Sequence, residues 1–436
     1  MAQREKFLGP LKPKDFLTPP EGFVPGLKHI YVVAGSGTSD IGKGWLASSV
    51  GSLVKKPLII KIDPMSNQTF PKDVGMVLDG VQVTDDFASY RYFGLDISPE
   101  QNLVMGNMWR QFLNATRIPP LIDESHEKKL TQTDFSEFLS QKIIKLTKKY
   151  KPENVIIEIG GIPSDLEHSP LPAALRLLSI HSLIVPELIM LSYFEHTNVG
   201  NQNRLKAQIV KEGIRNITEK YVGLPLKAVF VRRKYIPQEI PNERLKEELT
   251  RVAYETQVEP SKFVFLDNVE NLNEERIIVE QSGIFNEEEK QPMVSACLLG
   301  VPCRFNGALK PIGRNLNVLL PGGQALLLCP EVLVGLPIPR GPYEIVGGIG
   351  EDVLNGTAKV IDKDGQDVTK QFIQGAISTL KACLTNGVTK AILREKSPSC
   401  AVCRLEKLDE TPVSGNGVTT ALLQRWGFEC ISSDKI

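Results

Sequence analysis

Seven cysteines are the most reactive residues of this 436-residue chain, and all of them lie in its last third: Cys297, Cys303, Cys329, Cys383, Cys400, Cys403 and Cys430. The five histidines all precede residue 197, so the cysteine-rich part alone cannot build a mixed cysteine–histidine zinc site. An odd number of cysteines without an apolar leader argues against a disulfide framework. The open alternatives are metal or cluster ligands, redox chemistry and buried structural thiols.

A glycine-rich segment near the start of the chain predicts a second kind of chemistry. Residues 34–44 read AGSGTSDIGKG, in which Gly37, Gly42 and Lys43 have the spacing of a phosphate-binding loop. Gly44 stands where Ser or Thr usually closes that motif. Glycines let backbone N–H groups converge on an anion, and the lysine and the following helix start add positive potential. We therefore expect a phosphate site here, the alternative being a purely structural turn.

The elements that must position these residues form two α/β patterns. In the first, short apolar runs alternate with helix-like segments, which predicts a doubly wound, mostly parallel sheet. These runs lie at 29–35, 57–63, 154–161, 227–233 and 262–267. The second pattern has strand candidates at 292–300, 325–332, 391–397 and 428–433 and a helix candidate at 368–387. We expect an arm at 1–27, domains at 28–285 and 293–436, and a polar linker at 286–292.

Charge and composition are those of an ordinary globular protein. Lys plus Arg and Asp plus Glu both number 51, and apolar residues make up 42% of the chain. This balance gives no basic excess for a nucleic-acid or membrane surface. The longest apolar stretch, 171–194, is interrupted by Arg176, His181 and Glu187, which argues against a membrane span. We expect a cytoplasmic protein with two or three domains.

The first pattern resembles the amidoligase domain of CTP synthase. The matching segments are HIYVVAGSGTSDIGKGWLASSVGSL, IIKIDPMSN, DGVQVTDD, VIIEIGGIPSDLE, IPNERLKEEL and KFVFLDNVENL. The resemblance implies a fold of the phosphate-loop type, an ATP site, a pyrimidine nucleotide substrate and a homo-oligomer. It places Lys43 and Lys61 on ATP phosphates and makes Glu158 a Mg²⁺ ligand. The family's acidic stretch after VT-acid-acid is shortened, so Asp85 or Asp86 would supply the second carboxylate.

The last 146 residues are similar to the family that contains bacterial thiouracil desulfidases. The matching segments are SACLLGVPCRFNG, CPEVLVGLPIPRGPYEIVGG, QDVTKQFIQGA, ILREKSPSC and VSGNGVTTALLQRWGFECISS. The resemblance implies a smaller α/β iron–sulfur domain and a 4Fe-4S cluster, with the ligands Cys297, Cys329 and Cys400. It also implies catalytic roles for Glu331 and Ser397. From the residues alone, a four-thiolate zinc site that includes Cys303 and Cys403 stays open.

Three hypotheses about function follow from this domain order. The leading one is a desulfidase that removes sulfur from a thiolated pyrimidine and leaves a carbonyl. The second is an ATP-dependent synthetase that activates a pyrimidine carbonyl and transfers sulfide or another nucleophile. The third is an iron–sulfur protein regulated by nucleotide binding. ADP formation separates the second hypothesis from the others, and sulfide release without ATP supports the first.

Overall fold

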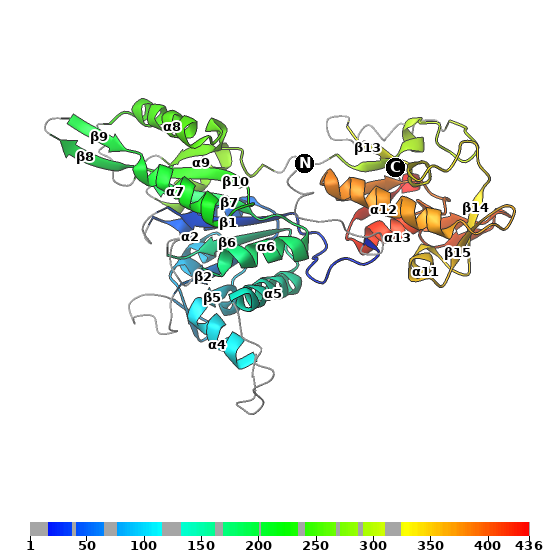
Figure 1. Ribbon diagram of the computed structural model, residues 1–436, viewed down its shortest axis with the longest axis horizontal. Coiled ribbons are helices and arrows are strands. Elements are labelled where there is room, and N and C mark those ends of the chain that lie inside the picture. Colours follow the sequence, from blue (N-terminus) through cyan, green and yellow to red (C-terminus); the bar gives the residue numbers. More distant parts are fainter. Residues whose placement is uncertain are drawn as a thin grey trace, which may run out of the picture. The chain divides into compact units, whose positions relative to one another are not determined.

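The computed structural model divides the chain into two compact units, Leu27–Asn286 and Met1–Gly26 with Glu287–Ile436 (Figure 1). The structure describes residues 16–36, 41–64, 76–115, 132–161, 169–199, 202–233, 240–266, 271–286, 291–309 and 324–435. Gly37 therefore lies outside the described residues. Within the described part of the chain, no helix combines the length and apolar character needed to cross a membrane.

The first unit is built on a parallel sheet of seven strands in the order β11-β10-β7-β1-β6-β2-β5. These strands are β1 (His29–Gly35), β2 (Pro57–Asp63), β5 (Asn102–Val104), β6 (Asn154–Ile159), β7 (Glu187–Tyr193), β10 (Leu226–Arg232) and β11 (Phe263–Leu266). Two hairpins are added, β3 (Met76–Leu78) with β4 (Val81–Val83) and β8 (Glu195–Val199) with β9 (Gln202–Lys206). All five predicted strands are confirmed; β5 and β7 were not predicted.

Helices cover this sheet because its central strands are apolar on both faces. They are α2 (Lys43–Leu53), α3 (Asp86–Tyr92), α4 (Met105–Ala115), α5 (Gln132–Tyr150), α6 (Leu171–Ser182), α7 (Gln208–Lys220), α8 (Asn242–Thr256) and α9 (Leu272–Gln281). In α5, buried Phe135, Leu139, Ile143 and Leu146 recur every three or four residues, which places them on one helix face. Every residue of β6 is buried, so the sheet is enclosed on both sides.

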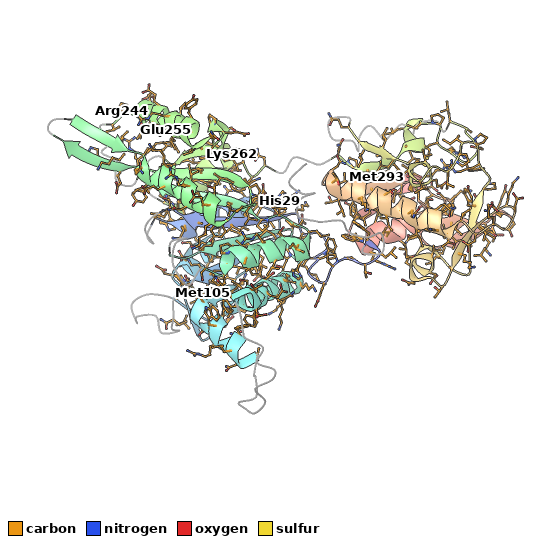
Figure 2. The ribbon with its side chains drawn as sticks, viewed as in Figure 1. His29, Met105, Arg244, Glu255, Lys262 and Met293 are labelled. Atoms are coloured by element: carbon orange, nitrogen blue, oxygen red, sulfur yellow. The ribbon has the colours of Figure 1, made fainter. Side chains whose placement is uncertain are left out.

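The second unit has a smaller parallel sheet in the order β13-β12-β16-β19. Its strands, β12 (Met293–Ser295), β13 (Leu326–Leu328), β16 (Lys390–Leu393) and β19 (Glu429–Ser432), confirm the four strand candidates. Met293 is labelled at the start of β12 in Figure 2. The helices are α10 (Pro330–Leu333), α11 (Gly350–Asn355), α12 (Thr369–Thr385) and α13 (Val418–Arg425). Two hairpins complete it, β14 (Tyr343–Val346) with β15 (Lys359–Asp362) and β17 (Arg404–Glu406) with β18 (Pro412–Ser414).

The described part of the N-terminal arm packs onto the second unit. The ring of Phe16 stacks on Trp426 with centroids 6.3 Å apart, and Phe23 contacts the same indole at 5.1 Å. The Trp426 Nε1–H donates to the Phe16 carbonyl (2.9 Å), and Arg425 donates to the Leu17 carbonyl (3.0 Å). The arm that sequence analysis set apart therefore completes the apolar core beside α13, although the whole first unit separates the two segments in sequence.

Candidate functional site

The three predicted cluster ligands follow strands of the smaller sheet. Cys297 lies in a 3₁₀ turn, Ala296–Leu299, directly after β12. Cys329 follows β13 and caps α10, and Cys400 lies in the loop after β16. These strands are neighbours and parallel, so their carboxyl ends meet at one edge of the sheet. The topology therefore brings together cysteines that are up to 103 positions apart in sequence.

A cavity of about 480 Å³ at this sheet edge is lined by Cys297, Cys303, Cys329 and Cys400. Glu331 and Ser397 line the same cavity. Every residue that the sequence analysis assigned to cluster binding or catalysis in this domain therefore faces one space. Cys303 also lines the cavity, although the resemblance did not assign it as a cluster ligand. It contacts two of the expected ligands, Cys297 and Cys329, and is 4% exposed.

The thiols at this cavity interact directly. Cys303 hydrogen-bonds to Cys297 and to Cys329, which raises the pKa of its own thiol. The contact with Cys303 lowers the pKa of Cys329 below its usual value, which favours the thiolate form of Cys329. Burial raises the pKa of Cys400 well above its usual value. A bound cation would offset that penalty, because metal binding and thiol deprotonation are coupled.

Glu331 is held from both sides in the first turn of α10. Arg340 Nε donates to its Oε2 at 2.7 Å, and the Ser399 hydroxyl donates to its Oε1 at 3.0 Å. Arg340 also donates to the Cys303 carbonyl at 3.0 Å, so one guanidinium links the carboxylate to the thiol cluster. The pair is nearly buried, with side-chain exposures of 3% for Arg340 and 11% for Glu331. These contacts fix the carboxylate at the cavity wall.

The two serines of the SPSC segment have different contacts. Ser397 Oγ accepts the backbone N–H groups of Ser399 (3.2 Å) and Cys400 (3.3 Å). It therefore shapes the turn that carries Cys400, and Ser397 itself lines the cavity. Ser399, which contacts Glu331, is 2% exposed and positions that carboxylate.

The other three cysteines do not line this cavity. Cys383 in α12 and Cys430 in β19 are near each other, and burial raises the pKa of both thiols to about 12. Cys403 is exposed and lies against Glu395, with Sγ and Oε1 3.6 Å apart. A thiolate site that includes Cys403 therefore has no support in this arrangement.

In the first unit, the phosphate loop begins where β1 ends. Gly42 has φ 86° and precedes the first turn of α2, a conformation that side chains disfavour. A Cβ on Gly44 would lie 2.0 Å from Asp86 Oδ1, which explains why Ser or Thr does not close this loop. Lys43 Nζ donates to the Gly161 carbonyl at 2.7 Å, and Arg232 Nη2 donates to the Gly42 carbonyl at 3.2 Å.

Beside this loop, the buried side chain of Lys61 lies among carboxylates. Its Nζ is 2.5 Å from both Glu158 Oε1 and Asp86 Oδ2. Burial alone would lower the pKa of Lys61, but the carboxylates outweigh burial and hold that pKa well above its usual value. Burial raises the pKa of Asp63 to about 7, and its Oδ2 is buried with no hydrogen-bond partner among the described residues. The structure thus brings Asp86, not Asp85, to Glu158.

Comparisons with known proteins divide the chain between two families. Residues 28–291 match the family model for the CTP synthase N-terminus. Residues 293–435 match the model for 2-thiouracil desulfurase. The chain belongs to both families, joining a CTP synthase N-terminal domain to a 2-thiouracil desulfurase domain. Both are families of enzymes.

Individual relatives fall into the same two groups. An uncharacterized protein of Bacillus subtilis strain 168, YbbK, is 40% identical over 146 residues, which is 33% of this chain and 96% of YbbK. The structure of the 4Fe-4S-dependent thiouracil desulfidase TudS shares 40% identity, covering 34% of this chain and 93% of TudS, with a TM-score of 0.30. The CTP synthase of Thermus thermophilus is 24% identical over 286 residues, 60% of this chain. This chain spans about half the length of that enzyme.

The donor sets at the two sites suit the cofactors that their families imply. In the desulfurase domain, cysteine side chains converge on one cavity, and thiolates are the usual protein ligands of iron–sulfur clusters. In the CTP synthase domain, carboxylate oxygens and the unpartnered Asp63 Oδ2 suit the hard cation Mg²⁺. Among the described residues, no three His, Cys, Asp or Glu side chains are arranged to hold a single metal ion.

Sequence reasoning missed several residues that hold these sites together. Arg340 was not singled out, although it lies in the quoted segment GLPIPRGP nine residues after Glu331. Arg232 at the end of β10 was missed as well; it pairs with buried Glu275 at 2.5 Å and reaches the phosphate loop. Tyr90, whose hydroxyl donates to Glu158, carried no signal beyond its helical position.

Proposed function

We propose that the desulfurase domain removes sulfur from a thiolated pyrimidine base, nucleoside or nucleotide by means of a 4Fe-4S cluster. The ligands would be Cys297, Cys329 and Cys400. The observation that supports this most directly is that these thiols, Glu331 and Ser397 line one cavity. Identity of 40% to TudS, a 4Fe-4S-dependent thiouracil desulfidase, over 93% of that protein agrees with it.

The reaction is a hydrolysis in which the C=S group and water give a C=O group and hydrogen sulfide, with no net transfer of electrons. When bound, a cluster with three protein ligands supplies an iron that is open to a sulfur atom. Glu331 would accept a proton from water as a general base. Arg340 and Ser399 hold the carboxylate in place through its two oxygens. The Ser397 hydroxyl would donate a hydrogen bond to substrate.

The CTP synthase domain, we propose, binds ATP with Mg²⁺. Lys43 and Lys61 would contact the phosphates, and Asp86 and Glu158 would hold the metal ion. The support is that Lys61, Asp86 and Glu158 already meet beside the phosphate loop. We also infer from the CTP synthase family that this domain forms a homo-oligomer, which sedimentation analysis tests.

Sulfide release under anaerobic conditions, with and without ATP, tests the proposal. Wild-type protein is expected to release sulfide from 2-thiouracil, 4-thiouracil or their nucleosides and nucleotides without ATP. Glu331→Gln is expected to retain the iron and lose most of the activity, whereas Glu429→Gln, at the exposed first residue of β19, retains both. The absence of sulfide release from all these compounds would overturn the proposal.

A second candidate is supported by the same carboxylates beside the phosphate loop. An ATP-dependent synthetase needs that arrangement, because metal and lysine offset the charge of the phosphoryl group that is transferred. In this case ADP forms when a pyrimidine nucleotide and a sulfur source are present, and a thiolated product appears. ADP measurement in the same assays separates the two candidates.

A further inference from the structure

The thiol cavity contains several charged side chains, and most are already paired. Arg340 is bound to Glu331, and Lys396 pairs with Glu406 at 2.6 Å. Glu395 accepts two backbone N–H groups from the loop that follows it. These groups therefore have little capacity left to bind a substrate.

Arg394 is not paired in this way. It directly follows β16, on the sheet edge that carries the cysteines, and it lines the cavity. Its Nη1 is buried, and no acceptor among the described residues hydrogen-bonds to it. No ion pair involves this guanidinium within the described part of the chain, and its backbone N–H is bound separately to Ser295 Oγ at 3.2 Å. A buried charged donor without an acceptor is costly, so this site is suited to an acceptor supplied by a ligand.

We propose that Arg394 determines specificity by donating a hydrogen bond to the second carbonyl oxygen of a thiopyrimidine, the oxygen not replaced by sulfur. This inference rests on the proposed desulfidase function. The place of Arg394 on the sheet edge that carries the cysteines, in the wall of the cavity, favours an acceptor on the base itself. Arg304, which is half-buried, and Lys407, which is exposed, also line the cavity; they are better suited to a solvated group such as a phosphate.

A hydrogen bond from Arg394 to this oxygen would both recognise the ring and polarise it. A charged donor on the second carbonyl draws electron density away from the ring, which makes the carbon that bears sulfur more susceptible to water. Water adds to that carbon, the C–S bond breaks, and both protons of the water leave with sulfur as hydrogen sulfide. A site built to bind a particular oxygen discriminates strongly against an analogue that lacks it.

The test compares 2-thiouracil with pyrimidine-2-thione, which lacks the 4-carbonyl oxygen. Loss of a hydrogen bond to a charged group corresponds to a decrease of about 10- to 140-fold in kcat/KM. Arg394→Gln is expected to lower kcat/KM for 2-thiouracil by that factor and to leave kcat/KM for pyrimidine-2-thione within about threefold of wild type. Calorimetry of uracil binding, which needs no turnover, should show a parallel loss of affinity. Arg394→Lys, which keeps a charged donor, should recover part of both.

The control is Arg404→Gln, because Arg404 pairs with Asp434 at 3.6 Å and does not line the cavity. Iron content is measured in each variant. An equal loss on both substrates, or no loss on either, would overturn the role of Arg394. So would a loss confined to thiolated nucleotides, which would assign Arg394 to phosphate. Absence of sulfide release from wild-type protein instead refutes the proposed function.

Discussion

Replacing Gly44 by alanine tests how the phosphate loop and the carboxylates depend on each other. The added Cβ would lie 2.0 Å from Asp86 Oδ1 and 2.8 Å from its Cγ. The side chain of Asp86 is 28% exposed, so it can turn toward solvent and leave Lys61. That movement removes a charge-assisted hydrogen bond worth about 1.5–3 kcal/mol. Alanine in a helix gains up to about 1 kcal/mol over glycine, so the lost contact dominates.

We therefore expect Gly44→Ala to weaken binding of Mg²⁺-ATP by about 10- to 140-fold, measured by calorimetry. Gly51→Ala is the matched control, because it adds the same atom to α2 next to Ile59 and Leu95 rather than beside the site. The control should bind Mg²⁺-ATP like wild type. Wild-type affinity in Gly44→Ala would show that Asp86 has no part in nucleotide binding.

Three further predictions follow from individual contacts. Phe16→Ala should lower the free energy of unfolding of the second unit by about 3 kcal/mol, because Phe16 is only 7% exposed and packs against Trp426. Tryptophan fluorescence monitors this unfolding, and an unchanged midpoint would contradict the prediction. Burial raises the pKa of Asp63 from 3.8 to about 7. Between these two pH values the folded state therefore keeps a proton on Asp63 that the unfolded state has lost. Without divalent metal, the first unit should lose stability from about pH 4 to pH 7, and Mg²⁺ should reduce that loss in thermal unfolding; a pH-independent midpoint would argue against it. Loss of a general base lowers the rate by about 10²–10⁴-fold. Glu331→Gln should therefore lower kcat by such a factor while the iron content stays at the wild-type level. Wild-type turnover in this variant would remove Glu331 from the mechanism.

The predictable parts of the fold are those in which local sequence and tertiary structure agree. Continuous apolar runs such as 154–161 formed central parallel strands, because both faces of such strands are buried. The helix at 369–385 matched its apolar spacing and ended before Asn386 and Gly387. By contrast, β5 is a three-residue edge strand, too short for a pattern. The apolar run that contains β7 also contains α6, so hydrophobicity alone could not separate them.

The candidate site divides in the same way. Residues that belong to short motifs, such as Cys329 with Glu331, could be predicted because covalent spacing keeps them close. Arg340 could not, because its role depends on a chain reversal that brings it back to Glu331 and to the carbonyl of Cys303. Likewise, the choice of Asp86 over Asp85 depends on the orientation of α3 against α2. The arm was separated from its partner Trp426 by about 400 residues, a distance at which sequence pattern carries no information.

Iron and acid-labile sulfide analysis of anaerobically purified protein tests the central claim most directly. Wild-type protein should be brown, with about four irons per chain, as the cluster type implies. Alanine at Cys297, Cys329 or Cys400 should remove the colour and the iron. Cys383→Ala, at a buried position of α12 away from the cavity, should retain both. Stoichiometric zinc without iron after anaerobic reconstitution would contradict the account, and so would full iron content in all three ligand variants.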